Sequence, residues 1–178
     1  MILALLERPD GAATAAGNRI VYDLERGEAH FGAAAVAGPA LVWELADSEP
    51  EGAALVAEVD VDPAGWLMRC DRIDFPPGGV AYRHTHPGPG IRRLLFGAIR
   101  IETEGGSTDY AAGGAWFERG PEPVYAVAAE GEPSAFVRVM LLPLDWEGKR
   151  TIRYVDPADE GKPKLQRPTV FFDRRLVA

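Results

Sequence analysis

Gly78-Gly79-Val80-Ala81-Tyr82-Arg83-His84-Thr85-His86-Pro87-Gly88-Pro89-Gly90 is the stretch of sequence that best indicates the fold. A glycine pair precedes a strand-like run, and a Pro-Gly-Pro-Gly turn closes it. Residues i and i+2 of a strand point to the same face, so we expect Tyr82, His84 and His86 to share one face. Two adjacent imidazoles inside a protein are costly to bury unless their nitrogens have partners. A divalent metal would be such a partner, because neutral histidine is a common ligand of Zn, Fe, Mn and Ni.

Further strand-like segments lie on both sides of this stretch and are separated by turns rich in glycine and proline. The segment 55–61 alternates apolar and acidic residues, as in a strand with one face on the core. Similar segments follow at about 66–75, 80–86, 91–102, 107–111, 114–118, 123–129 and 134–142. Short strands at such regular spacing, with no amphipathic helix among them, predict an all-β antiparallel sandwich or barrel.

The length of 178 residues suits one domain with one sizeable core. We predict a barrel core over about 54–143, an N-terminal extension over 1–53 and a C-terminal extension over 144–178. The C-terminal extension contains two predicted strands and a polar segment between them. It either wraps the barrel or pairs across a dimer.

Charge and composition exclude several functions. Acidic residues outnumber basic ones by 27 to 19, and the net charge of −8 disfavours nucleic acid or an anionic membrane surface as partner. No run approaches the roughly 18 apolar residues of a membrane span. The apolar start 1–6 meets Glu7-Arg8-Pro9 at once, and we interpret it as folded structure rather than a signal peptide. The single cysteine, Cys70, excludes an internal disulfide and favours a cytoplasmic location.

The histidine stretch resembles the first motif of the cupin superfamily. That motif runs Gly, five residues, His-x-His, three or four residues, Glu, six residues, Gly. Gly78, His84, His86 and Gly97 match it, whereas Gly90 stands in the place of the Glu.

The second cupin motif is degenerate in this chain. With Gly120 on its inner glycine, Glu118, Pro123 and Val127 stand in the places of the usual Pro, His and Asn. The resemblance covers 66–143 and implies a double-stranded β-helix (jelly roll), usually dimeric, with a small-molecule pocket inside. It does not imply one reaction, because cupins include both enzymes and plain binders.

Two of the four usual metal ligands are therefore present, and few residues are available to complete the set. Glu118 is either a third ligand, giving a two-His-one-carboxylate site, or a surface carboxylate paired with Arg119. Tyr82 and Tyr125 are candidates for the pocket, and the alternative for each is a packed barrel tyrosine.

Arg92 is unusual for a barrel strand. If the strand keeps its phase from Gly90, Arg92 points inward and would clamp a substrate carboxylate with its planar guanidinium. If a bulge reverses the phase, Arg92 or Arg93 forms a surface pair instead. Trp116 is a candidate pocket residue, with the barrel core as the alternative.

These features predict a cupin that binds a small molecule at a His-x-His site inside the barrel. The site holds a divalent metal, or its histidines hydrogen-bond the ligand. The alternative is a metal-dependent enzyme of the dioxygenase, isomerase or lyase type that acts on a small anionic substrate. The sequence names no catalytic residue, and we expect a homodimer.

Overall fold

The computed structural model describes residues 1–177, which form strands and three short 3₁₀ helices. The elements are β1 (Ile2–Arg8), β2 (Ala12–Thr14), β3 (Arg19–Asp23), β4 (Glu28–Phe31), β5 (Ala34–Val36), β6 (Ala40–Ala46), β7 (Ala53–Glu58), η1 (Pro63–Gly65), β8 (Trp66–Phe75), β9 (Val80–Thr85), β10 (Gly90–Phe96), β11 (Ala98–Thr103), β12 (Gly106–Ala111), β13 (Ala115–Glu118), β14 (Val124–Ala128), β15 (Ser134–Pro143), η2 (Leu144–Trp146), β16 (Arg153–Tyr154), η3 (Pro157–Gly161) and β17 (Arg167–Arg175). The prediction of an all-β protein is confirmed. None of the residues described forms a helix long and apolar enough to cross a membrane.

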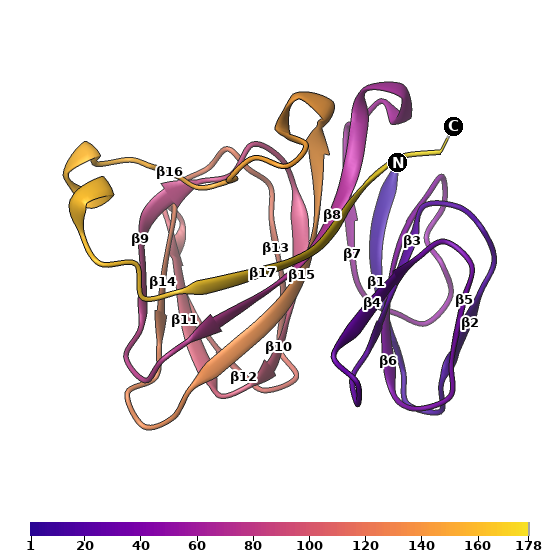
Figure 1. Cartoon of the computed structure of the whole chain (residues 1–178), viewed down its shortest axis with the longest axis horizontal. Helices are drawn as coiled ribbons and strands as arrows, with labels where there is room; N and C mark the ends of the chain where they lie inside the picture. The colour runs from indigo at the N-terminus through magenta and orange to yellow at the C-terminus, as the bar shows by residue number, and fades with distance from the viewer. Residues whose placement is uncertain (178) are drawn as a thin grey trace.

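Two five-stranded antiparallel sheets face each other and form the barrel (Figure 1). Their strand orders are β13-β10-β15-β8-β17 and β12-β11-β14-β9-β16. From β8 to β17, successive strands alternate between the two sheets, except that β11 and β12 lie in the same one. This is the double-stranded β-helix that the resemblance to cupins implied.

The N-terminal residues form a third layer, which packs on the outer face of the barrel (Figure 1). Its main sheet has the order β4-β3-β6-β1-β7, and β2 pairs with β5 beside it. Leu5 and Trp43 of this sheet share a hydrophobic core with Cys70 and Val139 of the barrel. The strand β7 pairs with β1 rather than with a barrel strand, although we assigned its residues to the barrel core. Its residues alternate between half-buried and exposed, but this alternation does not indicate which sheet the strand joins.

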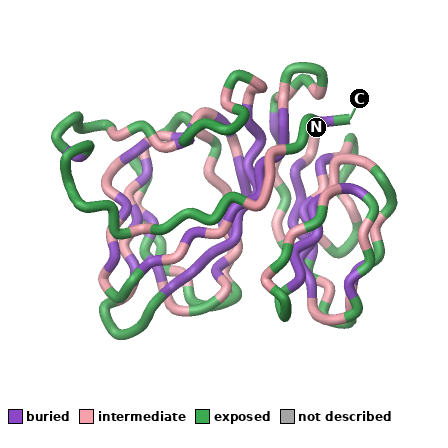
Figure 2. Tube along the Cα trace, viewed as in Figure 1, coloured by how far each residue is buried: buried purple, intermediate pink, exposed green. Residues whose placement is uncertain are grey.

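The barrel sheet that contains β15 lies between the other barrel sheet and the N-terminal sheet, and this position explains one unusual pattern of burial. Residues 134–142 of β15 are all buried, because one face of the strand lines the barrel and the other meets the N-terminal sheet (Figure 2). A strand buried on both faces reads as a continuous apolar run rather than as an alternation. Arg138 is the one charged residue in this run.

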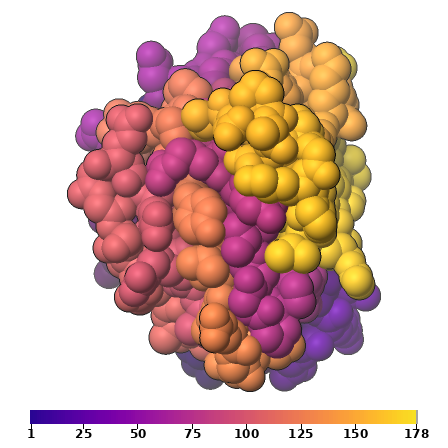
Figure 3. All heavy atoms as spheres, turned by 90° about the vertical axis from the view of Figure 1, so that its left-hand side faces the viewer, coloured from indigo at the N-terminus to yellow at the C-terminus, as the bar shows by residue number. Residues whose placement is uncertain are grey.

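The C-terminal segment wraps the barrel. The strand β16 pairs with β9, and β17 pairs along β8, so both additions are made within the same chain. In Figure 3 the C-terminal residues, in orange and yellow, lie over the magenta strands of the barrel. This segment closes one side of the space between the two barrel sheets.

Candidate functional site

The barrel encloses a cavity of about 570 Å³ between its two sheets and the C-terminal segment. Much of its wall is apolar and belongs to the barrel core. The wall residues that belong to the barrel core are Ile73, Phe75, Ala81, Ile101, Trp116, Val124, Ala126 and Phe136.

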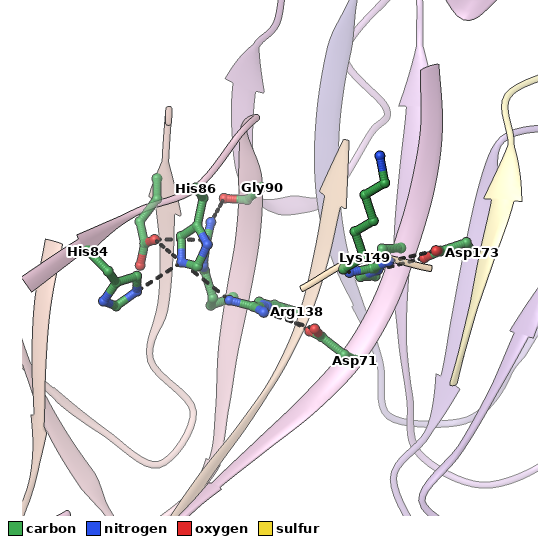
Figure 4. Close-up of polar contacts among 10 residues, drawn as sticks. Asp71, His84, His86, Gly90, Arg138, Lys149 and Asp173 are labelled. Atoms are coloured by element: carbon green, nitrogen blue, oxygen red, sulfur yellow. Dashed lines mark hydrogen bonds and ion pairs between the residues drawn. The ribbon is translucent and has the colours of Figure 1, made fainter. Parts of the chain in front are cut away.

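The two histidines meet at this cavity. His84 and His86 are 4% and 3% exposed, and their Nε2 atoms lie 3.1 Å apart (Figure 4). His84 Nδ1 lies 2.6 Å from the carbonyl oxygen of Tyr82. Because a carbonyl oxygen only accepts hydrogen bonds, Nδ1 carries the proton of the neutral ring, and Nε2 offers a lone pair.

Burial keeps both rings uncharged. It lowers the pKa of His84, against the Tyr82 carbonyl, which raises it. Burial also lowers the pKa of His86 well below its usual value, and the positive charge of Arg138 acts in the same direction. Both histidines are therefore neutral near pH 7.

A β-bulge in β9 turns Tyr82 away from the histidines. Ala81 pairs with Ala126 and His84 with Val124, so three steps along β9 match two steps along β14. The extra residue puts Ala81 and His84 on the cavity side, which corrects our expectation that Tyr82 shares the face of His84. The Tyr82 ring instead lies beneath the Lys162 ammonium, 4.7 Å from Nζ.

Tyr125 also lies outside the cavity. Its neighbours Val124 and Ala126 both line the cavity wall, so the alternation of β14 turns Tyr125 to the opposite face. Its assignment to the pocket is corrected for this reason.

Arg92 and Glu118 do face inward, and they contact each other. Arg92 Nη2 lies 2.7 Å from Glu118 Oε2 in an ion pair that lacks an aligned hydrogen bond. Arg92 Nη1 donates to the Gly90 carbonyl at 2.6 Å, and Trp116 Nε1 donates to Glu118 Oε1 at 2.8 Å. Burial lowers the pKa of Arg92 to about 10, although Glu118 raises it, so the guanidinium stays charged at neutral pH. Glu118 Oε2 is 3.7 Å from His86 Nε2.

Trp116 belongs both to the cavity wall and to the core. Its ring stacks on Tyr110, with centroids 4.8 Å apart, and meets the edge of Phe136 at 5.2 Å. The two interpretations offered by the sequence therefore apply together.

Sequence reasoning missed the ion pair of Arg138 with Asp71. Arg138 donates from Nε and Nη2 to the two carboxylate oxygens of Asp71 at 2.6 and 2.9 Å, and its Nη1 lies 3.4 Å from His86 Nε2 (Figure 4). The signal was present in the sequence, because a charged residue inside an apolar strand such as 134–142 must find a buried partner.

A second charged cluster lies where the C-terminal segment meets the barrel. Arg69 donates to both carboxylate oxygens of Asp173 at 2.6 Å and to the Lys149 carbonyl at 2.6 Å. Arg150 and Lys164, from the same C-terminal segment, also line the cavity. In all, nine charged residues line it, six of them basic (Arg69, Arg92, Arg138, Lys149, Arg150 and Lys164) and three acidic (Asp71, Glu118 and Asp173).

The polar residues at the histidines do not fit a firmly held divalent metal. Metal bonds to nitrogen are about 2.0–2.1 Å long and need a free lone pair at each ligand. The Glu118 carboxylate is engaged by Arg92 and Trp116, and the Arg138 guanidinium stands at His86 Nε2. Over residues 1–177, no three His, Cys, Asp or Glu side chains form a group that would hold a metal.

Comparisons with known proteins found partial matches among solved structures alone. No protein-family model matches the chain, and neither does any curated protein sequence. Among solved structures, the polyketide cyclase RemF from Streptomyces resistomycificus is similar, with 21% identity, 49% of this chain and 61% of that chain covered, and a TM-score of 0.41. A cupin-like protein from Thermotoga maritima is 18% identical, the match covers 53% of this chain and 75% of that chain, and the TM-score is 0.42. A cupin domain from Bordetella pertussis is 20% identical, the match covers 47% of this chain and 88% of that chain, and the TM-score is 0.38. The double-stranded β-helix itself follows from the strand order of the two barrel sheets described above.

Proposed function

We propose that the barrel binds a small organic anion with an apolar body. The observation that carries this proposal is the contrast between the charge of the cavity and that of the chain. Basic residues at the cavity exceed acidic ones by six to three, whereas the chain as a whole carries a net charge of −8. A cleft of one sign concentrates ligands of the opposite sign, and low-dielectric walls strengthen the effect.

The size and wall of the cavity suit such a ligand. A volume of about 570 Å³ lies within the range of about 300–1,000 Å³ that is usual for small-molecule sites. The apolar wall would cover the body of the ligand. The polar end would meet the neutral imidazoles and the guanidinium of Arg138.

Two further polar atoms support a ligand with polar groups. The Tyr154 hydroxyl and the Gln166 amide oxygen are buried without hydrogen-bond partners inside the described part of the chain, and both residues line the cavity. Buried polar atoms are usually paired, so we expect a ligand or ordered water to contact them.

Thermal-shift screening with matched pairs of compounds tests this proposal. Each organic acid is compared with its neutral amide of the same shape, and the acids should raise the melting temperature more. In an Arg150→Gln/Lys164→Gln variant this preference should weaken, whereas Arg100→Gln, outside the cavity, should leave it unchanged. Equal shifts for acids and amides would refute an anion site.

A metal-dependent enzyme that acts on an anionic substrate is the second candidate. The observation in its favour is the approach of the two Nε2 atoms to 3.1 Å, which would let both contact one ion. Elemental analysis of protein purified without a histidine tag tests it. Stoichiometric Fe, Mn, Ni or Zn that is lost in His84→Ala would support the enzyme, and protein free of metal would refute it.

The homodimer and the cytoplasmic location expected from the sequence stay predictions. Light scattering on the purified protein measures the first, and fractionation of the source cells measures the second.

A further inference from the structure

We infer that the Arg138 guanidinium, held by Asp71, takes the place that a metal cation would have at the histidine pair. The barrel then contacts its ligand through this guanidinium instead of through a metal ion. The position of the guanidinium is independent of the proposed function. Only the statement about the ligand rests on that proposal.

Neighbouring strands hold this cation in place. Arg138 of β15 and Asp71 of β8 are direct partners in the register of the central barrel sheet. Both side chains point to the cavity side, and their exposed fractions are only 6% and 2%. Asp71 occupies Nε and Nη2 of the guanidinium, which leaves Nη1 directed at the histidines. A bidentate pair of this kind fixes the plane of the guanidinium as well as its distance.

The guanidinium lies beside the nitrogen that a metal would use. Nη1 lies 3.4 Å from His86 Nε2, and this nitrogen is also 3.1 Å from His84 Nε2. A metal ion bonded to His86 Nε2 would therefore lie close to a positive charge in a buried, low-dielectric site.

The surrounding charges give a metal no compensation. Arg138 is balanced by Asp71, and Arg92 is balanced by Glu118. A divalent ion would add two uncompensated positive charges, and burying unpaired charge is strongly unfavourable. An anionic ligand group would instead find a guanidinium N–H in the cavity wall.

Cobalt binding tests the inference in the absence of any organic ligand. The visible absorption of Co²⁺ and titration calorimetry are measured for the wild type and for Asp71→Asn/Arg138→Gln, which removes both charges together. The matched control is Arg100→Gln/Asp109→Asn, because this exposed pair has the same two-bond geometry, at 2.8 and 3.0 Å. We expect Co²⁺ affinity to rise by at least about tenfold in the cavity variant alone, because a repelling charge has been removed.

Two results would overturn the inference. One is saturable Co²⁺ binding by the wild type, and the other is a folded cavity variant that binds Co²⁺ no better than the control.

Circular dichroism establishes folding, and a measurement on the wild type alone covers the case of an unfolded variant. In that measurement the imidazole ¹⁵N shifts of His84 and His86 should not change when Zn²⁺ is added, and a change would overturn the inference. Failure of organic acids to bind would refute the proposed function but would leave these metal results standing.

Discussion

Removing the Asp71 carboxylate should destabilise the protein strongly. In Asp71→Asn, the Arg138 guanidinium stays buried, with a side-chain exposure of 6%, and loses the two charged hydrogen bonds at 2.6 and 2.9 Å. Breaking one side of a buried ion pair costs about 3–5 kcal/mol. At about 2–4 °C per kcal/mol for a chain of this size, the melting temperature should fall by roughly 6–20 °C.

Urea unfolding followed by circular dichroism measures the free energy of unfolding. The double variant Asp71→Asn/Arg138→Gln should lose clearly less than the sum of its two single variants, because no unpaired charge remains. Asp109→Asn is the control: its pair with Arg100 has similar geometry but exposed side chains, and the loss should fall within the error of the measurement. A loss in Asp71→Asn as small as that in Asp109→Asn would refute the description of the inner pair as buried and unscreened.

Three other perturbations test separate parts of the structure. Burial would raise the pKa of Asp173, but hydrogen bonds from Arg69 and the Gly148 N–H outweigh it, and the pKa in the folded state is lowered. The resulting stability is fully present above the unfolded pKa of about 3.9 and is lost as the pH falls through the lower folded value, so Asp173→Asn should remove this part of the acid dependence of urea unfolding. Gly120→Ala should destabilise the fold and lower ligand affinity, since φ is +52° and a Cβ would lie 2.8 Å from the His86 carbonyl oxygen; unchanged melting and affinity would contradict this. Ala126→Phe should fill part of the apolar wall and reduce the binding of organic acids, whereas Ala111→Phe, outside the cavity, should not; equal affinities in calorimetry would argue against binding inside the barrel.

The sequence predicted the barrel because its signals are local. Glycine and proline turns at regular spacing, and alternation within short strands, depend on neighbouring residues only. The layer formed by the N-terminal strands could not be predicted in the same way, because the partner of a strand is a property of the whole fold. The assignment of β7 to the barrel was wrong for this reason.

The site was predicted in part. His84, His86, Arg92 and Glu118 meet at the cavity, since a strand period of two is sufficient to place most of them. The position of Tyr82 depended on a bulge in β9, and a single extra residue reverses the face of everything before it.

The ion pair between β8 and β15 was beyond a motif search. Arg138 and Asp71 lie 67 residues apart in the chain and meet through the pairing of two strands. A burial argument would still have identified Arg138 as needing a partner, because it interrupts an apolar strand. Asp71 gives no such signal, since its strand holds three other charged residues.

The most direct measurement is a crystal structure of the protein with the organic acid that stabilises it most in the thermal-shift screen. We predict that the acid lies inside the barrel, with its body against Trp116 and Phe136 and its anionic group at Arg138. We also predict that no metal is bonded to His84 and His86. An acid bound outside the barrel, or a metal bonded to both imidazoles, would contradict the account.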